Sequence, residues 1–340
     1  MKKLRTMLSI ALILCMLLSM AACGGSADTE ETKQDAAGEE SKTTEETKGS
    51  SEDGGGTYHI GLALDTYSNA INAEVASVFE ETCNERGYKY TVTDAEGDAS
   101  KQLGDINSLI QAKCDGIIVL PVSSNSVDEG IGACYDAGIP VATVLRDAPN
   151  AADKYVCFSG TDDVELGEIG GQWIADVTEG SGKVVYITGR TGVSTAENRT
   201  VGFHNIVDKY PDIEVVAESD GNYNRSDAMT VMESVLKAHP EIDAVWCAND
   251  EMAGGVCQAI AASGREGILV GGANFQFDAY ERLKNGEQAM DITTPCAMVI
   301  PAIDAVVTVI EGGTVEEKTM YYPLDLITID NVEEFVDQLY

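Results

Sequence analysis

From Tyr58 onward, the chain alternates between two patterns of apolar and polar residues. Short, uninterrupted apolar runs have the length of strands buried on both faces of a sheet. Longer segments carry apolar residues at every third or fourth position, as on one face of a helix. Strands that alternate with helices in this way predict an α/β fold built on doubly wound parallel sheets. A folded segment of about 280 residues exceeds what one core comfortably holds, which predicts two lobes of similar size.

The predicted elements form two series along the chain. The first series consists of the strands His59–Leu64, Tyr90–Ala95, Gly116–Val122, Val141–Leu145 and Tyr155–Ser159 and the helices Ala70–Arg86, Ser100–Lys113 and Val127–Ala137. The second series consists of the strands Lys183–Thr188, Glu214–Glu218, Ala244–Ala248, Ile268–Ala273, Ala289–Thr293 and Tyr321–Ile329 and the helices Val164–Val177, Thr195–Tyr210, Ser226–Ala238, Met252–Ala262, Asp278–Lys284 and Met298–Glu311.

The stretch Ala244–Gly255 links this fold to a function. Its apolar run predicts a buried strand that Asn249 closes, and Asp250 is predicted to be the N-cap of the helix that follows. Asn249 would then lie at the carboxyl end of a strand, facing the crevice where open α/β sheets bind small ligands. The alternative is that Asn249 and Asp250 only punctuate a turn between strand and helix, since both residue types favour turns.

The chain begins with the features of a targeting segment. A basic start is followed by the almost uncharged apolar run Met7–Met20, which is too short for a membrane span. The residues Ala21-Ala22-Cys23 resemble the end of a bacterial lipoprotein signal, which predicts that residues 1–22 are removed and that Cys23 carries a lipid. An ordinary secretory signal cut near Ala22 is the alternative, and either signal places the mature protein outside the cytoplasm.

Residues 23–56 are predicted to be a disordered acidic tether, because polar and charged residues dominate them and no apolar periodicity occurs. The whole chain has a formal net charge of −35 at pH 7. Phosphate binding needs a basic surface, so this charge argues against a nucleic-acid partner.

Nine cysteines occur, of which Cys15 and Cys23 belong to the start of the chain. The other seven show no CxxC spacing, so we expect neither a zinc site nor thioredoxin-like chemistry, and no metal or cofactor is predicted. Most of the seven lie in apolar strand or helix patterns, where a free cysteine acts as a small buried hydrophobe.

Several motifs resemble the type I periplasmic sugar-binding proteins of ABC importers, in particular the ribose-binding branch. They are NDEMA at Asn249–Ala253, GVSTAENRTVGF at Gly192–Phe203, and KCDGIIVLP, AGIPV and YPLDL in the expected order. The resemblance implies a monomeric extracytoplasmic receptor that captures a small polar ligand between two lobes and delivers it to a membrane permease. A receptor that presents its loaded form to a sensor kinase or chemoreceptor is the alternative.

The resemblance also implies how the chain is divided. Three crossings between the lobes are expected near Gly160–Asp162, Thr293–Pro295 and Tyr322–Leu324. The N-terminal lobe would then comprise residues 57–160 plus 295–322, and the C-terminal lobe residues 161–294 plus 323–340. The lobes would close around the ligand by hinge motion.

The ligand site implied by the resemblance draws on both lobes. Its residues are Asp65, Asn69, Ile71, Asn72 and Arg146 from the first lobe and Arg199, Tyr223, Asn249, Asn274 and Thr294 from the second. Sugar hydroxyls both donate and accept hydrogen bonds, which suits Asp, Asn and Arg side chains at strand ends.

Arg199 is expected in the first turn of a helix whose start, Ser194–Glu197, has capping-box spacing. A cation there opposes the helix dipole, which favours a binding role over a stabilising one. We therefore expect truncation of Arg199 or Asn249 to weaken binding while barely changing fold stability. A solvated surface arginine is the alternative.

Departures from the ribose-binding pattern argue against ribose as the ligand. The family's ribose binders have Asp where this chain has Leu145 and Asn274, Gln where it has Thr294, and two Phe where it has Ile71 and Asn72. A different pentose or hexose, a polyol, a furanosyl signal molecule and a ligand with an anionic group remain open.

An enzyme is not expected. The sequence contains no GxSxG, Walker A, GxGxxG or HExxH motif, and His59, His204 and His239 are scattered without metal-ligand spacing. A sugar-sensing repressor would share the fold, but it would need a helix-turn-helix in place of the signal and tether.

Overall fold

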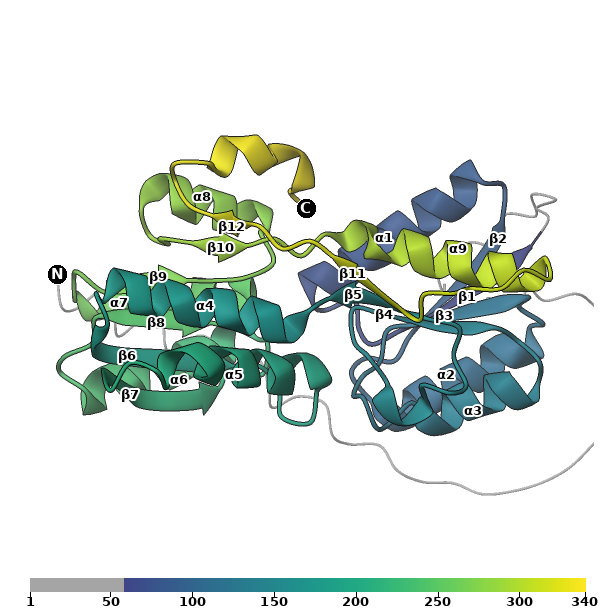
Figure 1. Cartoon of the computed structure of the whole chain (residues 1–340), viewed down its shortest axis with the longest axis horizontal. Helices are drawn as coiled ribbons and strands as arrows, with labels where there is room; N and C mark the ends of the chain where they lie inside the picture. The colour runs from purple at the N-terminus through teal and green to yellow at the C-terminus, as the bar shows by residue number, and fades with distance from the viewer. Residues whose placement is uncertain (1–57) are drawn as a thin grey trace, which may run out of the picture. The chain divides into compact units, whose positions relative to one another are not determined.

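The computed structural model describes residues 58–340 (Figure 1). The predicted signal, the predicted lipidation site Cys23 and the predicted acidic tether lie outside the described residues. Within the described part, no helix combines the length and the apolar character needed to cross a membrane.

The first lobe is built on a six-stranded sheet in the order β11-β5-β4-β3-β1-β2, in which every pair of neighbours is parallel. Its strands are β1 (His59–Leu64), β2 (Lys89–Asp94), β3 (Gly116–Val119), β4 (Val141–Val144), β5 (Phe158–Thr161) and β11 (Thr319–Tyr322). Its helices are α1 (Ala70–Glu85), α2 (Ala99–Gln111), α3 (Asp128–Asp136) and α9 (Val299–Ile310), with the 3-10 turns η1 (Pro149–Ala151) and η2 (Cys296–Met298).

The two faces of this sheet carry separate cores. Helices α1 and α9 cover one face and α2 and α3 the other (Figure 1). Along β1, Leu62 and Leu64 pack in the core under α1 and α9, while Ala63 packs in the core under α2 and α3. Successive strand residues point to opposite faces, so a strand covered on both sides is apolar throughout, as the sequence predicts.

The second lobe is built on a four-stranded parallel sheet in the order β7-β6-β8-β9. Its strands are β6 (Ser181–Thr188), β7 (Asp212–Asp220), β8 (Ala244–Cys247) and β9 (Leu269–Gly271), and its helices are α4 (Asp163–Val177), α5 (Ser194–Val207), α6 (Arg225–Ala238), α7 (Asp250–Ser263) and α8 (Phe277–Asn285). A two-stranded antiparallel sheet of β10 (Asp291–Ile292) and β12 (Leu326–Ile327) and the 3-10 helix η3 (Val332–Gln338) complete it.

Both lobes thus have the predicted α/β architecture with parallel sheets. The chain passes from one sheet to the other between β5 and α4, between β10 and η2, and between β11 and β12. The predicted elements are present, although most of their ends differ by one or more residues.

Three predictions of local structure are wrong. The final strand Tyr321–Ile329 is two strands, β11 and β12, which belong to different sheets. Pro323 stands between them and has no N–H to offer a ladder. Helix α7 is capped by Asn249 instead of Asp250, and α5 begins after Val193 without a side-chain cap, so Ser194–Glu197 is no capping box.

The seven cysteines of the described chain are free, and all but Cys257 are buried, as predicted. Burial raises the pKa of the Cys83 thiol to about 12 and that of Cys114 to about 11. Within residues 58–340 no cluster of His, Cys, Asp and Glu could hold a metal ion.

Helices α4 and α5 touch backbone to backbone. A Cβ added to Gly202 of α5 would lie 2.0 Å from the Val164 carbonyl oxygen of α4, and one added to Gly167 of α4 would lie 2.1 Å from the Arg199 carbonyl oxygen of α5. Behind this contact, Trp246 of β8 stacks on Phe203 of α5 with ring centroids 5.5 Å apart. Because Gly167 and Gly202 have no side chains, α5 lies close against α4, and this contact sets the position of Arg199 on α5.

We expect Gly202→Ala to lower the free energy of unfolding by about 1–3 kcal/mol, because the methyl group has no room against the backbone of α4. Urea unfolding of the purified protein measures this change. Gly104→Ala is the matched control, because Gly104 lies in α2 with no atom near its added Cβ. Its free energy of unfolding should rise by roughly 0.5–1 kcal/mol, since alanine favours the helix more than glycine does. Equal stabilities for the two variants would contradict the close contact.

Candidate functional site

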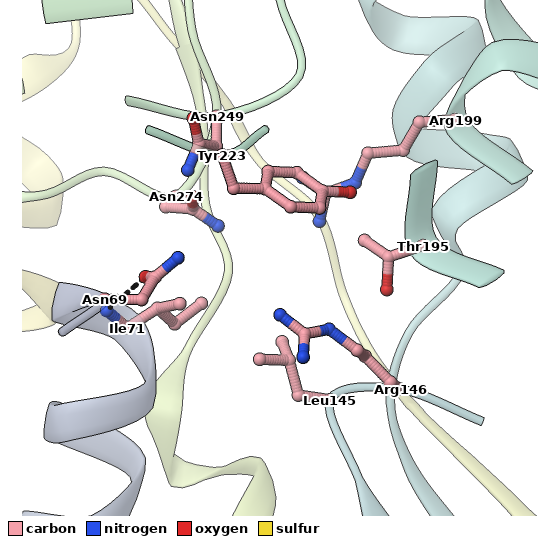
Figure 2. A pocket seen from close by; sticks show the side chains of 9 residues that line it. All are labelled: Asn69, Ile71, Leu145, Arg146, Thr195, Arg199, Tyr223, Asn249 and Asn274. Atoms are coloured by element: carbon pink, nitrogen blue, oxygen red, sulfur yellow. Dashed lines mark hydrogen bonds between the residues drawn. The ribbon is translucent and has the colours of Figure 1, made fainter. Parts of the chain in front are cut away.

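Loops at the carboxyl ends of strands in both sheets, together with the first turn of α1 and the first two turns of α5, line a cavity, as expected for parallel α/β sheets (Figure 2). We call it the first cavity, and its empty volume is about 280 Å³. Four first-lobe residues and five second-lobe residues line it: Asn69, Ile71, Leu145, Arg146, Thr195, Arg199, Tyr223, Asn249 and Asn274. Polar side chains from both lobes and the apolar side chains of Ile71 and Leu145 therefore face one space.

Most of the residues implied by the resemblance meet at this place. Asp65 lies in the wall of an adjoining second cavity. Asn72 and Thr294 line neither cavity: Asn72 is buried and donates to the Asp65 carboxylate at 3.3 Å, and Thr294 is buried as well. The sequence reasoning missed Thr195 and Arg190, a residue of the second cavity. Arg190 follows β6 as Arg146 follows β4. A search for polar residues just after each predicted strand would therefore have found it.

Arg146 is held by the first lobe. Its Nη1 donates to Asp65 Oδ2 at 2.5 Å and to the Pro121 carbonyl oxygen at 2.8 Å, and both side chains are buried. The preceding Leu145 has φ of 64°, in the left-handed region that non-glycine residues rarely adopt. Backbone strain of this kind concentrates at binding sites. It sets Leu145 and Arg146 side by side on one wall of the first cavity (Figure 2).

Arg199 is buried, so it is not a solvated surface residue. It lies in the second turn of α5 and not in the first turn, where the sequence predicts it. Its Nε donates to Asp163 Oδ1 at 2.9 Å, and its Nη1 donates to the Ala248 carbonyl oxygen. Burial alone would lower the pKa of Arg199, but the Asp163 carboxylate together with the nearby Tyr223 and Tyr186 raises that pKa above its ordinary value. Removing one partner of a buried ion pair costs about 3–5 kcal/mol. The expectation that truncation of Arg199 barely changes fold stability therefore conflicts with this buried ion pair, while a role of Arg199 in ligand binding stays a prediction.

Asn249 also has two tasks. Its Oδ1 accepts from the backbone N–H of Met252 at 2.9 Å and so caps α7. Its Nδ2 has no hydrogen-bond partner among residues 58–340, and the side chain borders the first cavity. One end of the amide serves the helix and the other is available to a ligand. The expectation that truncation of Asn249 barely changes fold stability therefore conflicts with the capping hydrogen bond.

Tyr223 covers another side of the cavity (Figure 2). It and Asn222 are consecutive left-handed residues, with φ of 54° and 57°. The ring lies directly on the backbone of Gly189, where an added Cβ would come within 2.0 Å of Tyr223 Cζ. The phenol oxygen is buried without a partner among the described residues. Burial raises the pKa of Tyr223 to about 12, so the hydroxyl stays protonated at neutral pH.

Contacts between the lobes flank the two cavities. Arg190 of the second lobe donates from Nη2 to the Val122 carbonyl oxygen at 2.7 Å and to Asp65 Oδ2 at 3.4 Å, both in the first lobe. The backbone N–H of Ser194 donates to Ser124 Oγ at 3.1 Å across the same boundary. Hydrogen-bond donors and acceptors in fixed positions and a few apolar side chains therefore line the two cavities, as in a ligand-binding site.

The comparisons with known proteins agree with this fold. The chain matches the family described as a periplasmic binding protein domain over residues 60–314. It is 32% identical over 272 residues to the ribose import binding protein RbsB of Bacillus subtilis (strain 168), which covers 80% of this chain and 87% of that protein.

Solved structures are similar as well. An ABC transporter solute-binding protein from Bacillus halodurans C-125 with bound myo-inositol has 26% identity and a TM-score of 0.78, covering 83% of this chain and 98% of that one. The fructose-binding periplasmic domain of a hybrid two-component system has 25% identity and a TM-score of 0.77, covering 83% of this chain and 94% of that one.

The capping role of Asn249 can be tested by substitution. We expect Asn249→Ala to lower the free energy of unfolding of the ligand-free protein by about 1 kcal/mol, because the N-cap hydrogen bond is lost. Asn249→Asp is the matched control, since its carboxylate keeps the cap and is favoured by the helix dipole. Chemical denaturation of both variants beside the unsubstituted protein makes the comparison. Full stability of the Ala variant would rule out the capping role.

Proposed function

Because this chain belongs to the periplasmic binding protein domain family, we propose that it captures a sugar or polyol between its two lobes and delivers it to an ABC importer. The family consists of solute-binding proteins that are not enzymes. The observation that carries the proposal is the first cavity, whose hydrogen-bonding side chains come from both lobes. A ligand that satisfies them gains contacts from both lobes only when the lobes are closed, and so shifts the population toward the closed form.

The side chains of the first cavity suit hydroxyl groups. Arg146 and the amides of Asn69 and Asn274 offer donors and acceptors, and the buried phenol of Tyr223 offers both. Ile71 and the Tyr223 ring give apolar surface for the C–H faces of a ring. Ribose, myo-inositol and fructose, named for the three similar proteins, all carry adjacent hydroxyls.

The charges around the site favour a neutral ligand over an anionic one. The Arg146 guanidinium is paired with Asp65, and the Arg199 guanidinium is paired with Asp163. Asp163 neutralises Arg199, and Asp65 offsets the charge of Arg146, although Asp65 also pairs with Arg190 beside the second cavity. An anionic ligand would need cations without partners, so we do not favour that alternative for the first cavity.

A sensing role is the second candidate. One similar structure is the periplasmic domain of a hybrid two-component system, in which the binding domain belongs to a signalling protein. Recovery of a membrane partner by cross-linking distinguishes the two roles: a permease supports import, and a sensor kinase or chemoreceptor supports sensing.

The family implies an extracytoplasmic location. We infer further that a lipid on Cys23 holds the protein at the outer face of the cytoplasmic membrane, with residues 23–56 as a leash. We expect Cys23→Ser to release the protein to the medium or leave it unprocessed, which fractionation and mass spectrometry of the N-terminus detect. A variant that stays membrane-bound with a processed start would contradict the lipid anchor.

We expect isothermal titration with a panel of neutral sugars and polyols to yield at least one ligand. Tyr223→Phe should weaken binding of that ligand by about fivefold to tenfold, corresponding to about 1 kcal/mol for one lost hydrogen bond. The ligand-free stability should stay unchanged, because the removed hydroxyl has no hydrogen-bond partner in the part of the chain that the structure describes.

Lys237→Ala, on the exposed side of α6, is the control and should leave the affinity unaltered. Failure of every neutral compound on the panel to bind would refute the proposal. Unaltered affinity in Tyr223→Phe would mean that this side chain is outside the binding site.

A further inference from the structure

The second cavity adjoins the first and shares Asn69, Arg146 and Tyr223 with it. Its empty volume is about 580 Å³, larger than that of the first. Loops after β1, β2 and β4 of the first lobe and after β6 and β7 of the second supply its walls. Apart from Gly97, every residue that lines it has a polar side chain. A ligand seated in the first cavity therefore has a polar space beside it.

A buried acceptor lies in the wall of this second cavity. Asp65 uses one oxygen, Oδ2, for all its hydrogen bonds, which come from Arg146, Asn72 and Arg190. The other oxygen, Oδ1, is buried and has no partner among residues 58–340. A buried carboxylate oxygen without a donor is costly, so a donor group of a ligand would satisfy it.

The charges around Asp65 decide which donor fits. The guanidinium groups of Arg146 and Arg190 flank the carboxylate and repel an ammonium group. The free Asp65 oxygen and the Glu96 side chain in the same wall repel a phosphate or a carboxylate. A hydroxyl can donate to Asp65 and accept from an arginine at the same time. The wall therefore matches neutral hydroxyl groups.

We propose that the second cavity is a subsite for a hydroxylated arm of the ligand, either a side chain of two or more carbons or a second glycosyl unit. The ring of the same ligand occupies the first cavity. This inference rests on the proposed function and narrows its ligand class to rings that carry such an arm.

Matched pairs of compounds test the subsite by isothermal titration with the purified protein. Each pair shares a ring and differs in the arm: methyl α-L-arabinofuranoside and methyl β-D-galactofuranoside, myo-inositol and galactosyl myo-inositol, and D-glucose and melibiose. In the pair whose ring is accepted, we expect the longer compound to bind at least about tenfold more tightly.

A bulky side chain that fills the second cavity should remove the preference for the longer compound. Ser68 is exposed, lines the second cavity and does not line the first. Ser68→Tyr should weaken binding of the longer compound by about tenfold or more and leave the shorter one within about twofold. Ser68→Ala is the matched control and should keep the preference of the unsubstituted protein.

The outcomes separate this inference from the function it rests on. Equal or tighter binding of the shorter compound in the accepted pair overturns the subsite and leaves the proposed function standing. Retention of the preference in Ser68→Tyr also overturns the subsite. Binding by no member of the three pairs counts against the proposed function itself, and the subsite falls with it.

Discussion

The carboxylate of Asp65 is the point on which both lobes converge. It accepts from Arg146 and Asn72 of its own lobe and from Arg190 of the other. Without this negative charge, the guanidinium groups of Arg146 and Arg190 would lie close together with no carboxylate between them. Breaking a buried ion pair by removing one partner costs about 3–5 kcal/mol, because the remaining charge stays buried. The position of Arg146 in the first cavity and the approach of Arg190 from the second lobe both depend on Asp65.

Other side chains that line the first cavity also stabilise the fold, as Asp65 does beside it. Asn249 caps α7 with one end of its amide, and Arg199 neutralises Asp163 at the start of α4. Tyr223 rests on the bare backbone of Gly189 in a left-handed conformation. Fixing the side chains in advance reduces the entropy that a ligand must remove on binding. It also means that loss of stability and loss of affinity have to be measured separately for each of these residues.

Much of this architecture follows from local sequence patterns. Apolar runs and helical periodicity predict the order of strands and helices, because burial on both faces of a parallel sheet leaves a direct mark on the sequence. The position of Asn249 at the carboxyl end of a strand explains why it could be expected at the cleft, whereas Arg146 was expected from the resemblance to the sugar-binding proteins. The rest depends on contacts between distant segments. The choice of Asn249 over Asp250 as the cap is settled by Asp250 accepting from the backbone N–H of Gln276 instead. The reach of Arg190 to Val122 requires both lobes in place.

The buried free cysteines can report local unfolding of the protein, because their thiols react only when they become exposed. A thiol reacts with an alkylating reagent as its thiolate, so burial and a raised pKa both protect the folded chain. The protected thiols are distributed over both sheets, with Cys134 and Cys157 in the first lobe and Cys247 in the second. Mass-resolved labelling over time would therefore record the local unfolding of each lobe separately, with no introduced dye and no change to the sequence.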